Sequence, residues 1–104
     1  MIAIVADEPM AELAEPIGAV LGVELRPRSS GYYGDPYYSG WPDSDVKLTL
    51  NRDPMYRAGD PEEDRFFSAE SPDARYVVWE ADAESERVAE LVAAGVTARV
   101  VGPA

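Results

Sequence analysis

Carboxylates are the groups in this sequence that are most able to do chemistry. One short segment holds Asp60, Glu62, Glu63 and Asp64, and a second, smaller group is Asp43-Ser44-Asp45. Grouped carboxylate oxygens can hold Ca²⁺ or Mg²⁺, and a pair across a pocket can act as general acid and base. The spacing lacks the central Gly and closing Glu of a calcium-binding loop. We therefore expect no metal site, and we interpret the 60–64 segment either as a surface for a basic partner or as a solvated loop.

Histidine and cysteine are absent from the chain, and their absence removes most catalytic chemistry. Thiol nucleophiles, imidazole bases, disulfides and the usual zinc, haem and iron–sulfur sites all need one or the other. The serines have no histidine to activate them. The glycines at 31, 34 and 40 are not followed by the Lys-Ser/Thr pair of a phosphate loop. We expect neither an enzyme nor a cofactor.

A cluster of aromatic residues in the middle of the chain is typical of a recognition surface. Half of the aromatic residues of the chain lie there, interleaved with Gly, Ser and Asp: Tyr32, Tyr33, Tyr37, Tyr38 and Trp41. Tyr and Trp offer large, rigid contact areas with few rotamers to order on binding. The alternative is a pair of strands whose rings alternate between core and solvent. We predict a binding role for at least two of these rings.

Charge and hydropathy narrow the class of partner. The chain has 20 acidic and 9 basic residues, for a formal net charge of -11. Phosphate contacts need clustered Lys and Arg, so we expect no nucleic acid and no membrane as partner, and a basic macromolecule is the natural complement. The alternative is that the acidity only maintains solubility. The apolar start of the chain at residues 1–6 is too short for a signal peptide or a spanning helix, which predicts a cytoplasmic protein.

The first elements follow from hydrophobic spacing. The apolar run Ile2–Ala6 predicts a strand inside a sheet. Pro9 suits the first position of a helix that ends near Gly22, and its apolar stripe is Met10, Leu13, Ile17, Val20 and Leu21. Pro16 removes one helical hydrogen bond, so we expect the helix to kink or restart there.

A hairpin and a central strand are expected next. Val23–Arg28 reads as a strand that Pro27 places at an edge or a strand end. Gly34-Asp35-Pro36 predicts a turn between the two Tyr pairs. Residues 46–51 alternate strictly, which predicts a strand; its inward side chains are Val46, Leu48 and Leu50, and its outward ones are Lys47, Thr49 and Asn51.

The rest of the chain combines a long loop with a second strand–helix–strand unit. We expect Asn51 and Asp53 to bond their own backbone before Pro54, and Phe66 or Phe67 to pin the 52–75 loop to the core. Tyr76–Glu80 and Thr97–Val101 predict strands. Between them a helix begins at Asp82 or Ser85 and ends at Gly95, where a left-handed cap would fold Val96 back onto Leu91 or Val92.

These elements predict a single α/β (α+β) domain over residues 1–104. Two helices that each have one apolar face can cover one side of a mainly antiparallel sheet, which gives a two-layer sandwich. A ferredoxin-like split β-α-β arrangement is the leading topology.

Several segments together resemble a family of bacterial proteins. They are the Leu21-Gly22-Val23-Glu24-Leu25 run, the Ser-Ser-Gly-Tyr-Tyr-Gly stretch before the second Tyr pair, Asn51-Arg52-Asp53-Pro54, the acidic Pro-containing loop and Tyr76–Glu80 before an acidic helix start. Over residues 12–95 this arrangement resembles small acidic immunity proteins encoded beside contact-dependent or secreted polymorphic toxins. The resemblance implies a non-enzymatic inhibitor that binds a cognate toxin domain.

Three functions stay open at this point. An immunity protein would bind a protein toxin with a basic surface, using the aromatic cluster as anchors and the acidic loop for charge complementarity; we expect it to be a monomer or dimer when free. A small ligand-binding or regulatory domain of ferredoxin-like type would have a concave pocket between sheet and helices. An acidic nucleic-acid mimic would carry carboxylates spaced like duplex phosphates.

Overall fold

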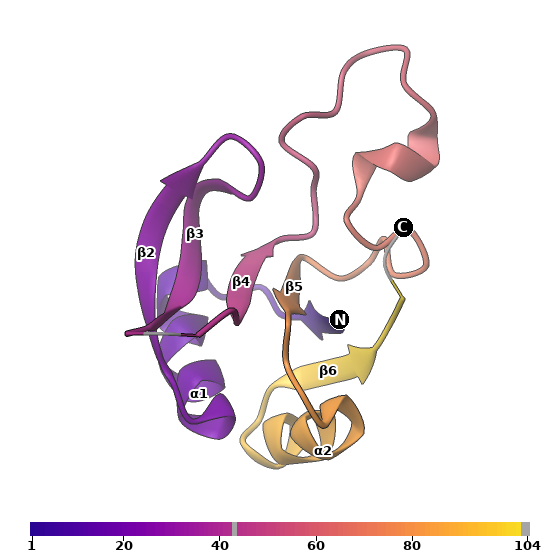
Figure 1. Ribbon diagram of the computed structural model, residues 1–104. Helices are drawn as coiled ribbons and strands as arrows, with labels where there is room; N and C mark the ends of the chain where they lie inside the picture. Colours follow the sequence, from indigo (N-terminus) through magenta and orange to yellow (C-terminus); the bar gives the residue numbers. More distant parts are fainter. Residues whose placement is uncertain (43, 103–104) are drawn as a thin grey trace.

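The computed structural model describes residues 1–42 and 44–102, so Asp43 of the smaller acidic group lies outside the described residues. The helices and strands lie along the chain as shown in Figure 1. They are β1 (Ile2–Val5), α1 (Met10–Leu21), β2 (Glu24–Ser30), β3 (Gly34–Trp41), β4 (Lys47–Leu50), the 3-10 helix η1 (Glu62–Arg65), β5 (Tyr76–Trp79), α2 (Glu84–Ala93) and β6 (Thr97–Val100).

A six-stranded sheet forms one layer of the fold, with strand order β2-β3-β4-β5-β1-β6. All neighbouring strands are antiparallel. Both helices pack on one face of this sheet, where their apolar side chains meet Ile2, Ile4, Leu48 and Val78. The predicted α+β sandwich of two helices on a mainly antiparallel sheet is therefore confirmed.

The ferredoxin-like strand order is not confirmed. β1 lies between β5 and β6, and α2 connects these two parallel strands. However, β2, β3, β4 and β5 form an uninterrupted meander. The strand that follows α1, β2, is therefore separated from β1 by three strands of the sheet. The two helices still reach both edges of the sheet, because Leu25 of β2 and Ala98 of β6 both pack in the main core.

The first helix is continuous through Pro16, so the restart expected there does not occur. An interior Pro costs about 3 kcal/mol. On either side of Pro16, Met10, Leu13 and Ile17 are buried against the sheet, and burial of each such side chain contributes about 1.5–3 kcal/mol. Packing on both sides of Pro16 therefore outweighs the missing hydrogen bond.

The β2–β3 hairpin has its turn at residues 31–33, three residues before the predicted Gly34-Asp35-Pro36 turn, which instead lies in β3. The hydroxyl oxygen of Ser30 decides this position, because it accepts hydrogen bonds from the backbone N–H groups of Tyr32 (3.1 Å) and Tyr33 (3.2 Å). Such local bonds from a serine favour a turn. β2, which contains Pro27, is an edge strand of the sheet as predicted.

The second face of the sheet is also covered, which the alternation in residues 46–51 did not predict. Val46 and Leu48 are buried as expected, but Leu50 is 43% exposed, whereas Thr49 and Asn51 are 0% and 3% exposed. Residues 52–75 cross the face that these polar side chains occupy, and they bury Phe67, Ser68, Ser71 and Ala74. Figure 1 shows this long segment on the side away from the two helices.

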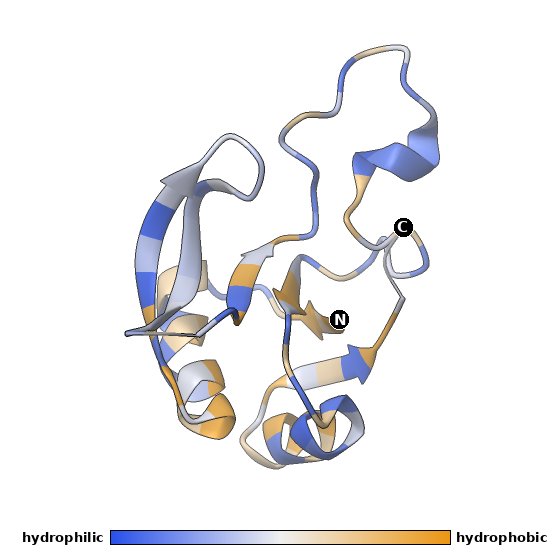
Figure 2. Ribbon diagram, viewed as in Figure 1, coloured by the Kyte–Doolittle hydropathy of each residue, from blue (hydrophilic) through white to orange (hydrophobic). Residues whose placement is uncertain are grey.

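The second helix and the last strand form where the sequence predicted them, but α2 begins at Glu84 after Ala83, so neither Asp82 nor Ser85 caps it. The predicted left-handed residue after the helix is confirmed, because Gly95 has a φ of 90°. The Val96 N–H then donates to the Leu91 carbonyl (2.9 Å), and both side chains are buried in the main core. Figure 2 shows hydrophobic residues along the central strands β1 and β5 and hydrophilic residues in η1.

The left-handed residue that ends α1 supplies a test of this fold. Gly22 has φ 73° and ψ 26°, and a Cβ added there would meet no atom within 4 Å. Gly22→Ala should therefore lower the free energy of unfolding by about 1 kcal/mol, through backbone strain alone. Gly31→Ala, in equally open space and without a positive φ, should change it by less than about 0.5 kcal/mol. Urea denaturation followed by circular dichroism measures the free energy of unfolding of both variants. Equal losses of stability would contradict the left-handed conformation of Gly22.

Candidate functional site

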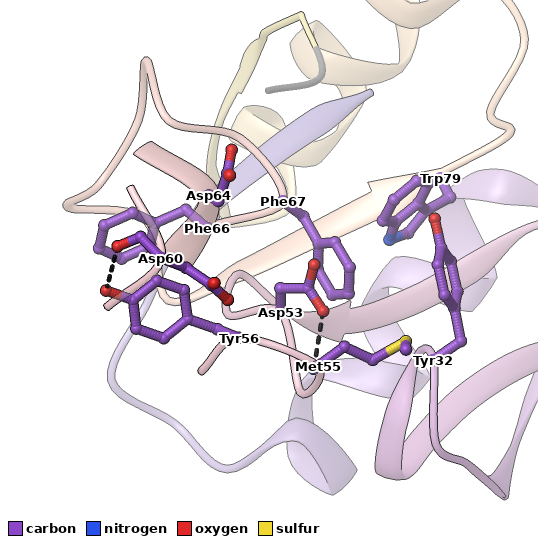
Figure 3. Close-up of a pocket in the computed structure, with 9 residues that line it drawn as sticks. All are labelled: Tyr32, Asp53, Met55, Tyr56, Asp60, Asp64, Phe66, Phe67 and Trp79. Carbon is purple, nitrogen blue, oxygen red and sulfur yellow. Dashed lines mark hydrogen bonds between the residues drawn. The ribbon is translucent and has the colours of Figure 1, made fainter. Parts of the chain in front are cut away.

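A cleft of about 360 Å³ opens between the β2–β3 turn, the end of β5 and the segment from residue 53 to residue 67. It has two kinds of lining: carboxylates and apolar or aromatic side chains. The lining residues are Tyr32, Asp53, Met55, Tyr56, Asp60, Asp64, Phe66, Phe67 and Trp79. No Lys or Arg is among them. Figure 3 shows the nine side chains, with the carboxylates of Asp53 and Asp60 between two groups of aromatic rings.

Four rings pack together at one side of the cleft and are here called the aromatic wall: Tyr32, Phe67 and Trp79 line the cleft, and Tyr33 packs against Tyr32 and Trp79. Each ring contacts the next, and the contacts close into a circuit with centroid distances of 4.8, 5.7, 4.9 and 6.2 Å. Three of the four contacts are edge-to-face, an arrangement that aromatic quadrupoles favour. The Trp79 indole N–H also donates to the Thr49 hydroxyl (2.9 Å). The wall is therefore held in place from three separate parts of the chain.

The buried side chain of Asn51 anchors the segment that carries the other side of the cleft. Its amide nitrogen donates to the carbonyls of Ser68 (3.3 Å) and Ser71 (2.9 Å), and its amide oxygen accepts from the Ser68 N–H (2.8 Å). The prediction that Asn51 bonds its own neighbouring backbone is therefore wrong. The covered second face of the sheet brings residues 17 and 20 positions away within its reach.

Local hydrogen bonds then shape the acidic side of the cleft. As predicted, Asp53 turns the chain before Pro54, with Oδ1 accepting from the Met55 N–H (2.8 Å). The Asp53 N–H donates to the carbonyl of Arg65 (2.9 Å), which closes the loop between them. Asp60 Oδ2 accepts from the Arg57 N–H (2.8 Å), and the Tyr56 hydroxyl donates to the Asp60 carbonyl (3.2 Å). Two carboxylates of the cleft thus have fixed orientations.

The carboxylates of the cleft form no ion pair with the part of the chain that the structure describes. None of the ion pairs among the described residues includes Asp53, Asp60 or Asp64. The nearby Arg65 pairs with Glu62 in η1 (3.2 Å). Within the described part of the chain, no three acidic side chains come together closely enough to hold a metal ion. The cleft thus combines carboxylates with aromatic rings, two kinds of group that each attract cations.

The structure brings together only part of the site predicted from the sequence. Tyr32, Asp60 and Asp64 line the cleft, and Tyr33 lies in the aromatic wall with Tyr37 packed beside it (5.3 Å). Glu62 and Glu63 are exposed in η1 and do not line it.

Two of the predicted aromatic residues lie elsewhere. Tyr38 faces the helices and packs against the main core, and Trp41 is at the far end of β3, 42% exposed. The alternation of side chains along β3 separates Tyr37 from Tyr38. The predicted aromatic cluster is therefore not a single surface.

Six lining residues were not predicted as site residues: Asp53, Met55, Tyr56, Phe66, Phe67 and Trp79. The sequence indicated a turn for Asp53 and a strand for Trp79, and nothing in the local pattern connects these two positions. Phe67 does pack onto Trp79 (4.9 Å), which confirms that one of the paired phenylalanines pins the loop. In the sequence, the paired phenylalanines were thus the feature that indicated contact between the 52–75 loop and the sheet.

Comparison with known proteins does not identify a relative. No protein-family model, curated protein or solved structure matches this chain. Among the described residues, no helix is both long and apolar enough to cross a membrane. The resemblance to immunity proteins therefore stays a hypothesis, and its support has to come from the cleft itself.

The anchoring role of Asn51 leads to a prediction about stability. Asn51→Ala leaves one buried N–H and two carbonyls of the 68–71 segment without their partner, so we expect the free energy of unfolding to fall by about 2–3 kcal/mol. Arg52→Ala, at the exposed neighbouring position, should change it by less than about 0.5 kcal/mol. Chemical denaturation measures both, and a loss below about 1 kcal/mol for Asn51→Ala would refute the anchor.

Proposed function

We propose that this protein is a non-enzymatic immunity protein that binds and neutralises a cognate bacterial toxin domain with a basic surface, acting in the cytoplasm. One observation carries the proposal: the cleft places Asp53, Asp60 and Asp64 beside aromatic rings, of which Tyr32 is 51% exposed, and none of the three carboxylates forms an ion pair among the described residues. Such a site complements positive charge that comes from another molecule.

The charge of the whole chain supports a macromolecular partner. A net charge of -11 on a chain of 104 residues produces a field that extends beyond the cleft. A field of that sign accelerates encounter with a basic surface and repels nucleic acid and anionic lipid. Toxins that act on nucleic acids or nucleotides tend to carry basic clefts, so an acidic inhibitor can cover the surface that they use for their substrate.

The cleft has the composition of a binding site. Aromatic anchors supply contact area at small entropic cost, and the exposed carboxylates of η1 surround them with charge that steers association. The chain has no His or Cys, and the cleft lining consists of Asp, Met, Phe, Tyr and Trp side chains. These residue types favour recognition over nucleophilic catalysis.

Co-expression tests this proposal. The product of the gene adjacent to that of this chain should arrest growth when it is expressed alone, and co-expression of this chain should restore growth. The purified pair should form a one-to-one complex in isothermal titration calorimetry. Failure to bind, together with failure to restore growth, would reject the proposal.

The salt dependence of the same complex tests the electrostatic part of the argument. Raising the salt concentration from about 50 mM to about 500 mM shortens the screening length several-fold, so the dissociation constant should rise at least about tenfold. An affinity that does not change over this range would show that charge complementarity does not drive the association.

A second candidate function is the binding of a small cationic ligand. The cleft volume of about 360 Å³ is within the range of small-molecule sites. In that case a thermal-shift screen of metabolites should find a small amine or guanidine compound that raises the melting temperature, and co-expression should not protect against the neighbouring gene product.

A further inference from the structure

We infer that the cleft is the receptor for one arginine side chain of the protein partner, with the guanidinium held between an aromatic ring and the carboxylates of Asp60 and Asp64. This inference rests on the proposed function, because it assigns the part of the toxin that enters the site. It names one occupant for the cleft: a guanidinium presented by a basic protein surface.

The lining itself selects a cation with a flat apolar surface. Tyr32 and Tyr56 border the cleft together with three carboxylates, and no basic side chain lines it. Another ring at its border, Phe66, already has the guanidinium carbon of Arg65 5.9 Å from its centroid, and Arg65 pairs with Glu62. The face of an aromatic ring attracts a cation, and a guanidinium stacks on it with part of its surface desolvated. Among the described residues, no three carboxylates come together as a group that could hold a metal ion.

The same molecule already holds one of its own arginines in this manner. The guanidinium carbon of Arg26 lies 4.2 Å from the ring centroid of Trp41. Arg26 Nε and Nη2 both donate to Glu24 Oε2, at 3.1 and 3.0 Å. Glu24 and Trp41 are cross-strand partners in β2 and β3. This triad shows on the surface of this protein how a ring and a carboxylate bind a guanidinium, and the cleft offers both groups.

Two of the three carboxylates of the cleft, those of Asp53 and Asp60, are oriented before any ligand arrives. Asp60 uses Oδ2 to accept the Arg57 N–H, and Asp53 uses Oδ1 to accept the Met55 N–H. The second oxygen of each carboxylate accepts no hydrogen bond from the described residues. Groups held in place in this way lose little conformational freedom on binding.

Arginine fits this arrangement better than lysine does. A guanidinium presents five N–H donors in one plane, so it can bond two carboxylates while its face lies on a ring. An ammonium group is more strongly hydrated and has no flat face. On the outer side of the aromatic wall, the Lys47 ammonium is 5.1 Å from the Tyr33 ring centroid and donates to the backbone carbonyl of Asp45. Lys47 thus contacts an aromatic ring and a backbone carbonyl, whereas Arg26 contacts an aromatic ring and a carboxylate.

Titration with a single-residue probe tests the inference without the toxin. N-acetyl-arginine methylamide would be added to the ¹⁵N-labelled full chain while the indole N–H signals of Trp79, in the cleft, and Trp41, outside it, are followed. We expect a saturable shift of the Trp79 signal with a millimolar dissociation constant. The lysine analogue should bind at least about fivefold more weakly, and the uncharged citrulline analogue should not saturate. No saturable shift at Trp79, or equal binding of the citrulline analogue, would overturn the inference.

Matched variants locate the site. Asp60→Asn and Asp64→Asn each remove one charge from the cleft, and the amide oxygen at position 60 can still accept the Arg57 N–H. Glu63→Gln removes one charge from the same loop at an exposed position that does not line the cleft. Both cleft variants should weaken probe binding at least about fivefold, and Glu63→Gln by less than about twofold. An equal effect of all three variants would show a nonspecific response to net charge and would overturn the inference.

The complex with the toxin separates this inference from the proposed function. If the Asp60→Asn, Asp64→Asn double variant binds and neutralises the toxin as tightly as the unsubstituted chain, the arginine site is wrong and the proposed function stands. If the adjacent gene product does not bind while the probe saturates the cleft with the expected variant pattern, the proposed function fails and the specificity of the cleft for guanidinium stands.

Discussion

Three hydrogen bonds of one buried amide govern the second face of this protein. Asn51 lies at the end of β4 on the side of the sheet that the helices do not cover, and its side chain binds the backbone at Ser68 and Ser71. An amide buried without these partners would destabilise the fold by about 1–3 kcal/mol. The segment from residue 52 to residue 75 has little secondary structure of its own, so its position depends on this anchor and on the packing of Phe67 against Trp79.

The cleft is a direct consequence of that anchored segment. Its two sides belong to parts of the chain that are distant in sequence, namely the β2–β3 turn with the end of β5 and the loop closed by Asp53 and Arg65. The aromatic wall gives one side rigidity through edge-to-face contacts. Backbone N–H groups orient the carboxylates of Asp53 and Asp60 on the other side. The helix-covered face contributes stability, and the loop-covered face contributes the site.

The electrostatics of the molecule act over two distances. The net charge of -11 acts at long range, where a field of this sign attracts basic molecules and repels anionic ones. Inside the cleft, carboxylates and aromatic rings lie side by side at contact distance. Asp60, Glu62, Glu63 and Asp64 are all exposed, but only Asp60 and Asp64 line the cleft. The acidic cluster of the sequence is therefore divided between the cleft and the surface beside it.

Local patterns in the sequence determined most of the secondary structure and the fold class, since alternation, the apolar stripe of α1 and the glycines after both helices act over a few residues. They also indicated a phenylalanine that holds the long loop. Only the tertiary structure decided that Thr49 and Asn51 are buried, because the backbone that covers them lies far along the chain. It also assembled Asp53, Tyr56 and Trp79 into one cleft, because side chains that meet across a sheet and a loop leave no periodic signal in the sequence. The position of the hairpin turn depended on the Ser30 hydroxyl, which competes with the stronger turn signal at Gly34-Asp35-Pro36.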